Sequence, residues 1–263
     1  MAKKMGVPFG KLCVGVNIND VTHRAFSTGL VRRPTEGERM KQSLSDAINI
    51  QLPYNLERLL FYLTNENHGQ VKAWYHRLEN GDDNKDIQQK AGCIDLRQST
   101  TITKDSTTNW LTQLQNEFRS ARVTDDQLCA AMNRCLEDYG YWVDPHTGVA
   151  FAAAEQLGYL NGDNASQGED VDANNSQTNK STVTAVALMA TASPCKFQNA
   201  VTTALGKEKW EEYELDHFPS RGKDLKDKIE TQPIVYLAEP GKSLEDNQLV
   251  WEAKTRELVD QLG

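Results

Sequence analysis

The most informative residues of the sequence are Thr182-Val-Thr-Ala-Val-Ala-Leu-Met-Ala-Thr191 and Ala192-Ser-Pro-Cys-Lys-Phe197 directly after them. The first part predicts a buried strand, and the second turns that strand into a helix that runs to Leu205 and ends at Gly206. A strand that ends in small hydroxyl residues at a helix N-terminus is where α/β folds bind anionic ligands and cofactors. An ordinary turn without a ligand explains the same residues equally well.

A second strand is predicted much earlier in the chain. Lys11-Leu-Cys-Val-Gly-Val-Asn17 is apolar on both faces, as a buried parallel strand is, and it ends in a turn composition. Helical patterns fill most of the sequence between the two strands. The predicted helices span residues 53–63, 70–78, 108–118, 124–139 and 144–155, followed by a closing helix over 243–262. The sequence therefore predicts an α/β fold with a mainly helical insertion.

Two of these helices carry clear start signals. Thr124 and Gln127 have the spacing of a capping box, and Gly140 suits the end of that helix. Asp144 is a candidate N-cap for the next helix, with Pro145 in its first turn.

Residues 161–182 contain a single large apolar side chain and predict a disordered surface loop. We divide the chain into residues 1–19, a helical excursion over 20–140, a return to the sheet over 141–206 and a helical tail over 207–263.

Composition excludes several classes of protein. The 263 residues carry a net charge of −8, which disfavours a nucleic-acid partner, and no apolar run is long enough to cross a bilayer. Five cysteines without a C-x-x-C pair suggest neither disulfides nor zinc, so a reducing, cytoplasmic location is expected. The histidines lack metal-like spacing, and a calcium loop starting at Asp163 fails at Ala165. No metal is predicted; among the histidines, His146 alone is kept as a site candidate.

Five blocks of sequence, in order, resemble a known family. They are Ala2-Lys-Lys-Met-Gly-Val-Pro-Phe-Gly-Lys-Leu12, Asn17-Ile-Asn-Asp-Val-Thr-His23, Tyr54-Asn-Leu-Glu-Arg-Leu-Leu-Phe61, Tyr139-Gly-Tyr-Trp-Val-Asp-Pro-His-Thr-Gly-Val149 and Ala190-Thr-Ala-Ser-Pro-Cys-Lys-Phe197. Together they resemble the C-terminal portion of threonine synthases, in particular the fungal type and the threonine-synthase-like proteins. The resemblance implies part of a three-layer, fold-type-II domain of pyridoxal-phosphate enzymes, with residues 1–19 and 141–206 in that domain.

The same resemblance implies an activity and site residues. The family converts O-phospho-L-homoserine and water to L-threonine and phosphate with pyridoxal 5'-phosphate as cofactor. Thr191 matches the hydroxyl residue that meets the cofactor's pyridine nitrogen. Asn55 and Arg58 match the family's Asn-x-Glu-Arg block near the substrate, although Arg58 equally suits an ion pair within its helix. His146 and Thr147 are the remaining candidates for substrate binding.

Departures from the family pattern limit what the chain is expected to do alone. The Schiff-base lysine of a Phe-Lys-Asp motif and the Gly-Asn-Phe-Gly phosphate loop are not in these residues, so no catalytic residue is assigned. We therefore expect a C-terminal portion that lacks catalysis by itself. Two alternatives remain, a non-catalytic binding or regulatory module and a phospho-lyase that stops after elimination. Leu52-Pro-Tyr54, in place of the Ser-Ser usual before the Asn, is nearer the phospho-lyases, whereas Thr191 argues for synthesis. The oligomeric state stays open.

Overall fold

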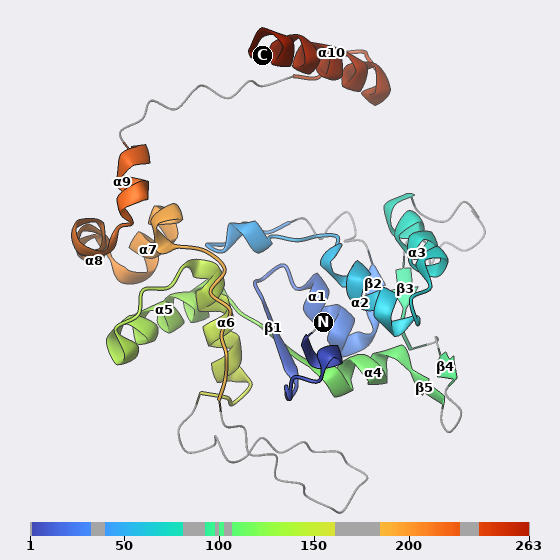
Figure 1. Cartoon of the computed structure of the whole chain (residues 1–263), viewed down its shortest axis with the longest axis horizontal. Helices are drawn as coiled ribbons and strands as arrows, with labels where there is room; N and C mark the ends of the chain where they lie inside the picture. Colours follow the sequence, from blue (N-terminus) through green and yellow to red (C-terminus); the bar gives the residue numbers. More distant parts are fainter. Residues whose placement is uncertain are drawn as a thin grey trace, which may run out of the picture. The chain divides into compact units, whose positions relative to one another are not determined.

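A pair of parallel strands lies among the helices of residues 1–218 in the computed structural model (Figure 1). Strand β1 (Leu12–Val16) pairs with β6 (Phe118–Arg122) in a register that runs from Leu12 opposite Phe118 to Val16 opposite Arg122. The prediction of a strand over 11–17 is confirmed. Strand β6 was not predicted, because its polar residues Arg119, Ser120 and Arg122 hide the strand pattern.

The structure describes residues 2–32, 40–80, 93–97, 100–102, 107–160, 185–226 and 237–262. The short helix η1 (Ala2–Met5) precedes β1. Between β1 and β6 the described elements are, in order, α1 (Val21–Thr28), β2 (Leu30–Arg32), η2 (Asp46–Ile48), α2 (Asn55–Leu63), α3 (His68–Asn80), β3 (Cys93–Asp95), β4 (Thr100–Ile102), β5 (Thr107–Asn109) and α4 (Trp110–Glu117). After β6 come α5 (Asp125–Tyr139), α6 (Pro145–Gln156), η3 (Pro194–Lys196), α7 (Gln198–Leu205), α8 (Lys207–Glu212), η4 (Tyr213–His217), α9 (Ser220–Lys226) and α10 (Leu244–Leu262). Strands β2 and β3, and β4 and β5, form two small antiparallel pairs.

Helices cover both faces of the parallel pair. Helix α6 crosses β1 at Gly15, where an added Cβ would lie 3.0 Å from the Val149 carbonyl and 3.0 Å from the Ala153 methyl. Helix α1 contacts both strands as well. Ala121 belongs to the core shared with α5 and α6, whereas Phe118 packs on the other core, with α1, α2, α3 and α4. Residues three apart on a strand point to opposite faces, so the pair is a layer between two helical layers.

The capping predictions are confirmed. The Thr124 hydroxyl accepts from the Gln127 backbone N–H at 3.3 Å, and the Gln127 side chain accepts from the Thr124 N–H at 2.9 Å. Gly140 ends α5 in the left-handed conformation, with φ of 64°. Asp144 is the N-cap of α6, and Pro145 is its first residue. These local signals fix where α5 and α6 begin.

The predicted strand over 182–191 is wrong for residues 185–190, which have no regular secondary structure. A strand needs a neighbour for its backbone hydrogen bonds, and no described strand pairs with this segment. Val186 and Met189 are exposed, and Leu188 is half-buried against the core of α5 and α6. The predicted loop 161–182 lies outside the described residues.

Residues 219–263 form a separate unit that carries α9 and α10. The closing helix predicted over 243–262 is confirmed as α10, and the Ser243 hydroxyl caps it by accepting from the Asp246 N–H at 3.1 Å. Within the described ranges, every helix is too short or too polar to span a membrane.

Candidate functional site

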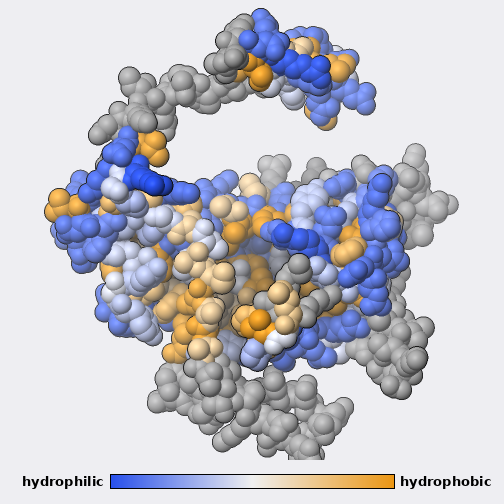
Figure 2. All heavy atoms as spheres, viewed as in Figure 1, coloured by the Kyte–Doolittle hydropathy of each residue, from blue (hydrophilic) through white to orange (hydrophobic). Residues whose placement is uncertain are grey.

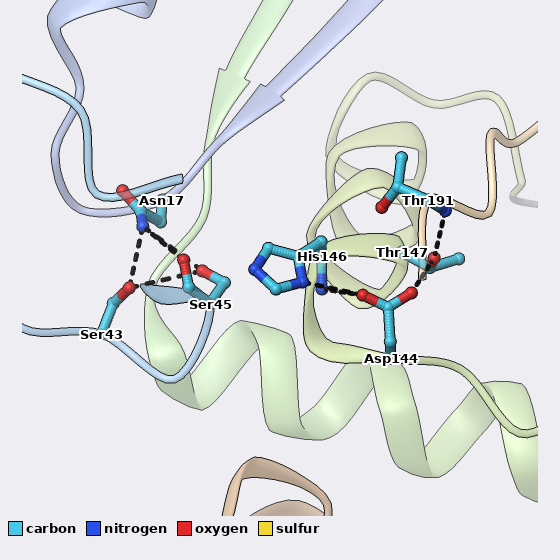
Figure 3. Close-up of polar contacts among 7 residues, drawn as sticks. All are labelled: Asn17, Ser43, Ser45, Asp144, His146, Thr147 and Thr191. Carbon is cyan, nitrogen blue, oxygen red and sulfur yellow. Dashed lines mark hydrogen bonds and ion pairs between the residues drawn. The ribbon is translucent and has the colours of Figure 1, made fainter. Parts of the chain in front are cut away.

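A cluster of hydroxyl and amide groups lies at the carboxyl end of β1 (Figure 3). Asn17 directly follows the strand and is 1% exposed. Its Nδ2 donates to Ser43 Oγ at 2.8 Å and to Asn49 Oδ1 at 2.7 Å, and it also lies 3.3 Å from Ser45 Oγ. Ligands of α/β folds bind at the carboxyl ends of parallel strands. The cluster therefore joins the polar segment 43–49 to that edge of the sheet.

The first turn of α6 carries a second polar group, centred on Asp144. The Asp144 side chain is fully buried, and its Oδ1 accepts from the His146 backbone N–H at 2.9 Å and from His146 Nδ1 at 2.8 Å. Its other oxygen, Oδ2, accepts from the Thr147 hydroxyl. Because α6 crosses Gly15 at Val149, its first turn extends toward the carboxyl end of β1.

The hydrogen bonds around Asp144 set its charge. Burial raises the pKa of this carboxyl, but the hydrogen bonds from the His146 ring, the Thr147 hydroxyl and the His146 backbone N–H outweigh burial and hold the pKa below its ordinary value. Asp144 is therefore ionised at neutral pH. An ionised partner at Nδ1 favours the His146 tautomer with its proton on that nitrogen.

The His146 ring is enclosed on the inner side of this site. Its side chain is 7% exposed, and the Phe197 ring packs edge-on against it with 4.7 Å between ring centroids. Nε2 is buried and has no hydrogen-bond partner among the described residues. Figure 3 shows the ring extending from α6 toward Ser45, with Nε2 on that side. An acceptor nitrogen in this position suits a ligand group that donates a hydrogen bond.

Thr191 reaches the same turn of α6 from the segment 185–193. Its backbone N–H donates to the Thr147 hydroxyl oxygen at 3.4 Å, while the residue itself is exposed. The structure thus brings three of the predicted site residues, His146, Thr147 and Thr191, together around Asp144 (Figure 3). Asp144 was predicted only as a cap, although its spacing to Thr147 was available in the sequence.

A cleft of about 590 Å³ lies beside this group. Phe197, which also packs against His146, is one of its lining residues. The others are Ser43, Leu44, Asp46, Lys196, Gln198, Asn199, Ala200 and Thr202. Lys196 and Asp46 contribute charges of opposite sign to its walls. The cleft therefore lies between the segment that contributes Ser43 to the Asn17 cluster and the segment that packs Phe197 against His146.

Among the residues that the structure describes, no hydrogen bond or ion pair joins Asn55 or Arg58 to this group. Both are exposed on α2, whose buried residues Leu56 and Leu60 belong to the core on the other face of the strand pair. Within the described part of the chain Arg58 makes no ion pair, so the alternative of a salt bridge in its helix is not observed.

Sequence reasoning did not identify the Asn17 cluster as part of a site. Its only signal was a turn composition after a buried strand, because its other members are supplied by a segment 26 to 32 residues away. Among the described residues, no group of three His, Cys, Asp or Glu side chains is arranged to hold a metal ion.

Comparison of the sequence with protein families matches the family described as "Threonine synthase, C-terminal" over residues 170–238. Threonine synthase of Saccharomyces cerevisiae is 29% identical over 244 residues, which cover 85% of this chain and 38% of the yeast protein. A human protein, threonine synthase-like 2, is 28% identical over 150 residues, covering 57% of this chain and 26% of that protein.

Solved structures show the same relationship. The crystal structure of yeast threonine synthase superposes with a TM-score of 0.64 at 25% identity, covering 98% of this chain and 44% of that one. Threonine synthase from Brucella melitensis with bound pyridoxal phosphate superposes with a TM-score of 0.58 at 25% identity, covering 88% of this chain and 38% of that one. The chain therefore spans less than half the length of these relatives, and the expected partial α/β domain of fold type II is confirmed.

Proposed function

Because this chain belongs to the threonine synthase family, we propose that it contributes the C-terminal part of an active site that converts O-phospho-L-homoserine and water to L-threonine and phosphate. The family depends on pyridoxal phosphate. The observation that carries the proposal is Thr191, an exposed hydroxyl residue whose backbone is anchored to the buried turn of α6.

The residues around Thr191 fit this cofactor. Pyridoxal phosphate, when bound, supplies an electron sink for removal of a proton from the substrate. A threonine hydroxyl is both a donor and an acceptor, so Thr191 is able to pair with the pyridine nitrogen of the cofactor. A hydroxyl rather than a carboxylate at this position leaves that nitrogen largely unprotonated. Thr147 and Asp144 would hold the Thr191 backbone in place.

An exposed apolar surface supports a role as one part of a larger fold. Figure 2 shows hydrophobic residues gathered along α6 and the segment 185–190 beside a hollow. Val186 and Met189 of that segment are exposed large apolar residues, as are Phe9 before β1 and Leu12 at its start. Parallel sheets are normally buried on both faces and contain more than two strands. We infer that further strands cover this surface in the working enzyme.

The chain by itself is expected to be inactive. None of its four Lys-Asp pairs, at Lys85, Lys104, Lys223 and Lys226, follows a Phe as the family's Schiff-base lysine does, and Lys196 belongs to another block. The expected result is therefore no phosphate release from O-phospho-L-homoserine by the isolated chain with added cofactor. Stoichiometric, borohydride-trapped cofactor on the isolated chain would contradict this expectation.

A chimaera tests the activity itself. Joining the part of yeast threonine synthase that precedes the matched region to this chain restores the length of the family. We expect phosphate release with threonine as the product, a loss of activity in Thr191→Ala, and retained activity in Thr191→Ser. A folded chimaera that binds the cofactor but releases no phosphate overturns the proposal, and a 2-oxo acid product identifies a phospho-lyase.

Thr191 supports synthesis over elimination alone, because the resemblance implies a hydroxyl residue at this position in the synthases. The five cysteines contain no C-x-x-C pair, which fits a reducing compartment, and we propose on this ground that the protein lies in the cytosol.

A further inference from the structure

We propose that Asp144 is the positioning residue of this site. One of its carboxylate oxygens fixes Thr191 through Thr147, and the other holds the His146 ring so that Nε2 is left as a hydrogen-bond acceptor. The inference rests on the proposed function, in which Thr191 pairs with the cofactor. His146 Nε2 then accepts a hydrogen bond from a donor group that the ligand brings. Its test uses the chain without cofactor.

The first arm runs from Asp144 to Thr191. The Thr147 hydroxyl has one proton, and that proton is donated to Asp144 Oδ2. Its lone pairs therefore face other donors, and the backbone N–H of Thr191 approaches one of them at 3.4 Å. Thr147 is 4% exposed, so water does not compete for the hydroxyl. The carboxylate thus decides which way the hydroxyl points and whether it accepts from Thr191.

This arm matters because segment 185–190 is not held by a neighbouring strand. In the described residues the segment has no strand partner, and Thr191 itself is exposed. The contact with Thr147 joins the end of this segment to a buried helix. It is the hydrogen bond that ties Thr191 to α6 in the described part of the chain.

The second arm runs from Asp144 to His146. Oδ1 accepts from both the backbone N–H and Nδ1 of His146, which fixes the ring at two points. With the Nδ1 proton engaged, Nε2 carries a lone pair, and it is buried without a partner among the described residues. A buried acceptor left unpaired costs stability unless a donor arrives. The chemical class that satisfies it is an ammonium, hydroxyl or water brought with the ligand.

Other charged groups do not explain the arrangement. Asp125 accepts from the Leu44 backbone N–H at 3.3 Å, and Lys196 lies at the exposed rim of the cleft. No contact joins either of them to the His146 ring in the described part of the chain. Asp144 is therefore the group that orients both His146 and Thr191.

The experiment for the first arm measures amide hydrogen exchange at Thr191 in the full chain. Thr147→Val keeps the side-chain shape but removes the hydroxyl, whereas Thr147→Ser keeps the hydroxyl. We expect exchange at Thr191 to be about fivefold faster in Thr147→Val, corresponding to one lost hydrogen bond, and within twofold of the parent in Thr147→Ser. The Val201 amide of α7, which donates to the Phe197 carbonyl at the helix N-cap at 2.9 Å, serves as the unaffected reference.

The second arm is read from the nitrogen chemical shifts of the His146 ring in the unmodified chain. The expected result is the tautomer protonated at Nδ1, with Nε2 unprotonated; His23, whose Nδ1 lies 2.9 Å from Ser120 Oγ, is the comparison ring. Unchanged exchange at Thr191 in Thr147→Val rejects the first arm. A His146 ring protonated at Nε2 rejects the second. Neither result depends on cofactor binding, so failure here is distinct from failure of the proposed function.

Discussion

Helix α6 and the segment 185–190 are both rich in alanine and other small or aliphatic residues, yet most of their side chains differ in how far they are buried. Phe151, Ala152, Ala153 and Ala154 are buried in the core, whereas Val186 and Met189 are exposed. A helix satisfies its own backbone hydrogen bonds, so its apolar face only needs a surface to pack on. A strand also needs a neighbouring strand. An apolar stretch therefore predicts burial but does not supply the partner that burial requires.

The largest expected effect is a loss of packing between α5 and α6. Leu128 is 1% exposed. A Cβ added to Gly148 would lie only 2.5 Å from Leu128 Cδ1, so α5 and α6 are in close contact there. We expect Leu128→Ala to lower the free energy of unfolding by about 2–5 kcal/mol. Urea unfolding followed by circular dichroism measures it.

Leu249→Ala is the control for that experiment, because Leu249 is 66% exposed on α10. Its expected effect is within about 0.5 kcal/mol. Equal effects of the two substitutions would show that the α5 and α6 core is not the stable part of the chain.

The sequence predicted what local signals encode. The capping box at Thr124, the N-cap at Asp144 and the strand β1 depend on residues close together in the chain, and all three are confirmed. Strand β6 was missed because its partner β1 lies more than a hundred residues earlier and its polar residues conceal the pairing. The contact of Thr191 with Thr147 spans 44 residues and depends on the path of the segment between them. Motifs could identify both residues, but not their contact.

Asp144→Asn is expected to have the next largest effect, and its sign depends on pH. The folded pKa of Asp144 lies below the ordinary value, so the ionised carboxylate stabilises the fold at neutral pH and loses this contribution as the pH falls through the folded pKa. Asparagine keeps one acceptor and the cap but loses the charge. We expect a loss of about 1–2 kcal/mol at pH 7 and a flatter decline of stability below pH ~4. If the free energies of unfolding of the parent chain and of Asp144→Asn change with pH in parallel, this expectation is contradicted.

Removal of the α5 cap is expected to cost less. The Thr124 hydroxyl satisfies one N–H group at the start of the helix, and replacement of such a cap by alanine costs about 1 kcal/mol. Thr124→Ala should therefore lower the free energy of unfolding by that amount, while Thr124→Ser should retain most of the stability because it keeps the hydroxyl. Urea unfolding of both variants tests whether local signals stabilise this region as the comparison assumes.

The smallest expected effect lies in the segment 185–190, where two neighbouring residues provide a matched pair. Met189 is 74% exposed, whereas Leu188 packs in part against the core of α5 and α6. In the isolated chain, Met189→Ser should change the free energy of unfolding by less than about 0.5 kcal/mol, and Leu188→Ser should lower it by about 1 kcal/mol. In the active chimaera, where further strands are proposed to cover this surface, Met189→Ser should become more destabilising than it is in the chain alone. If its effect is the same in both proteins, the segment gains no neighbour in the larger fold, and the contrast between α6 and residues 185–190 is a property of the chain itself rather than of a missing strand partner.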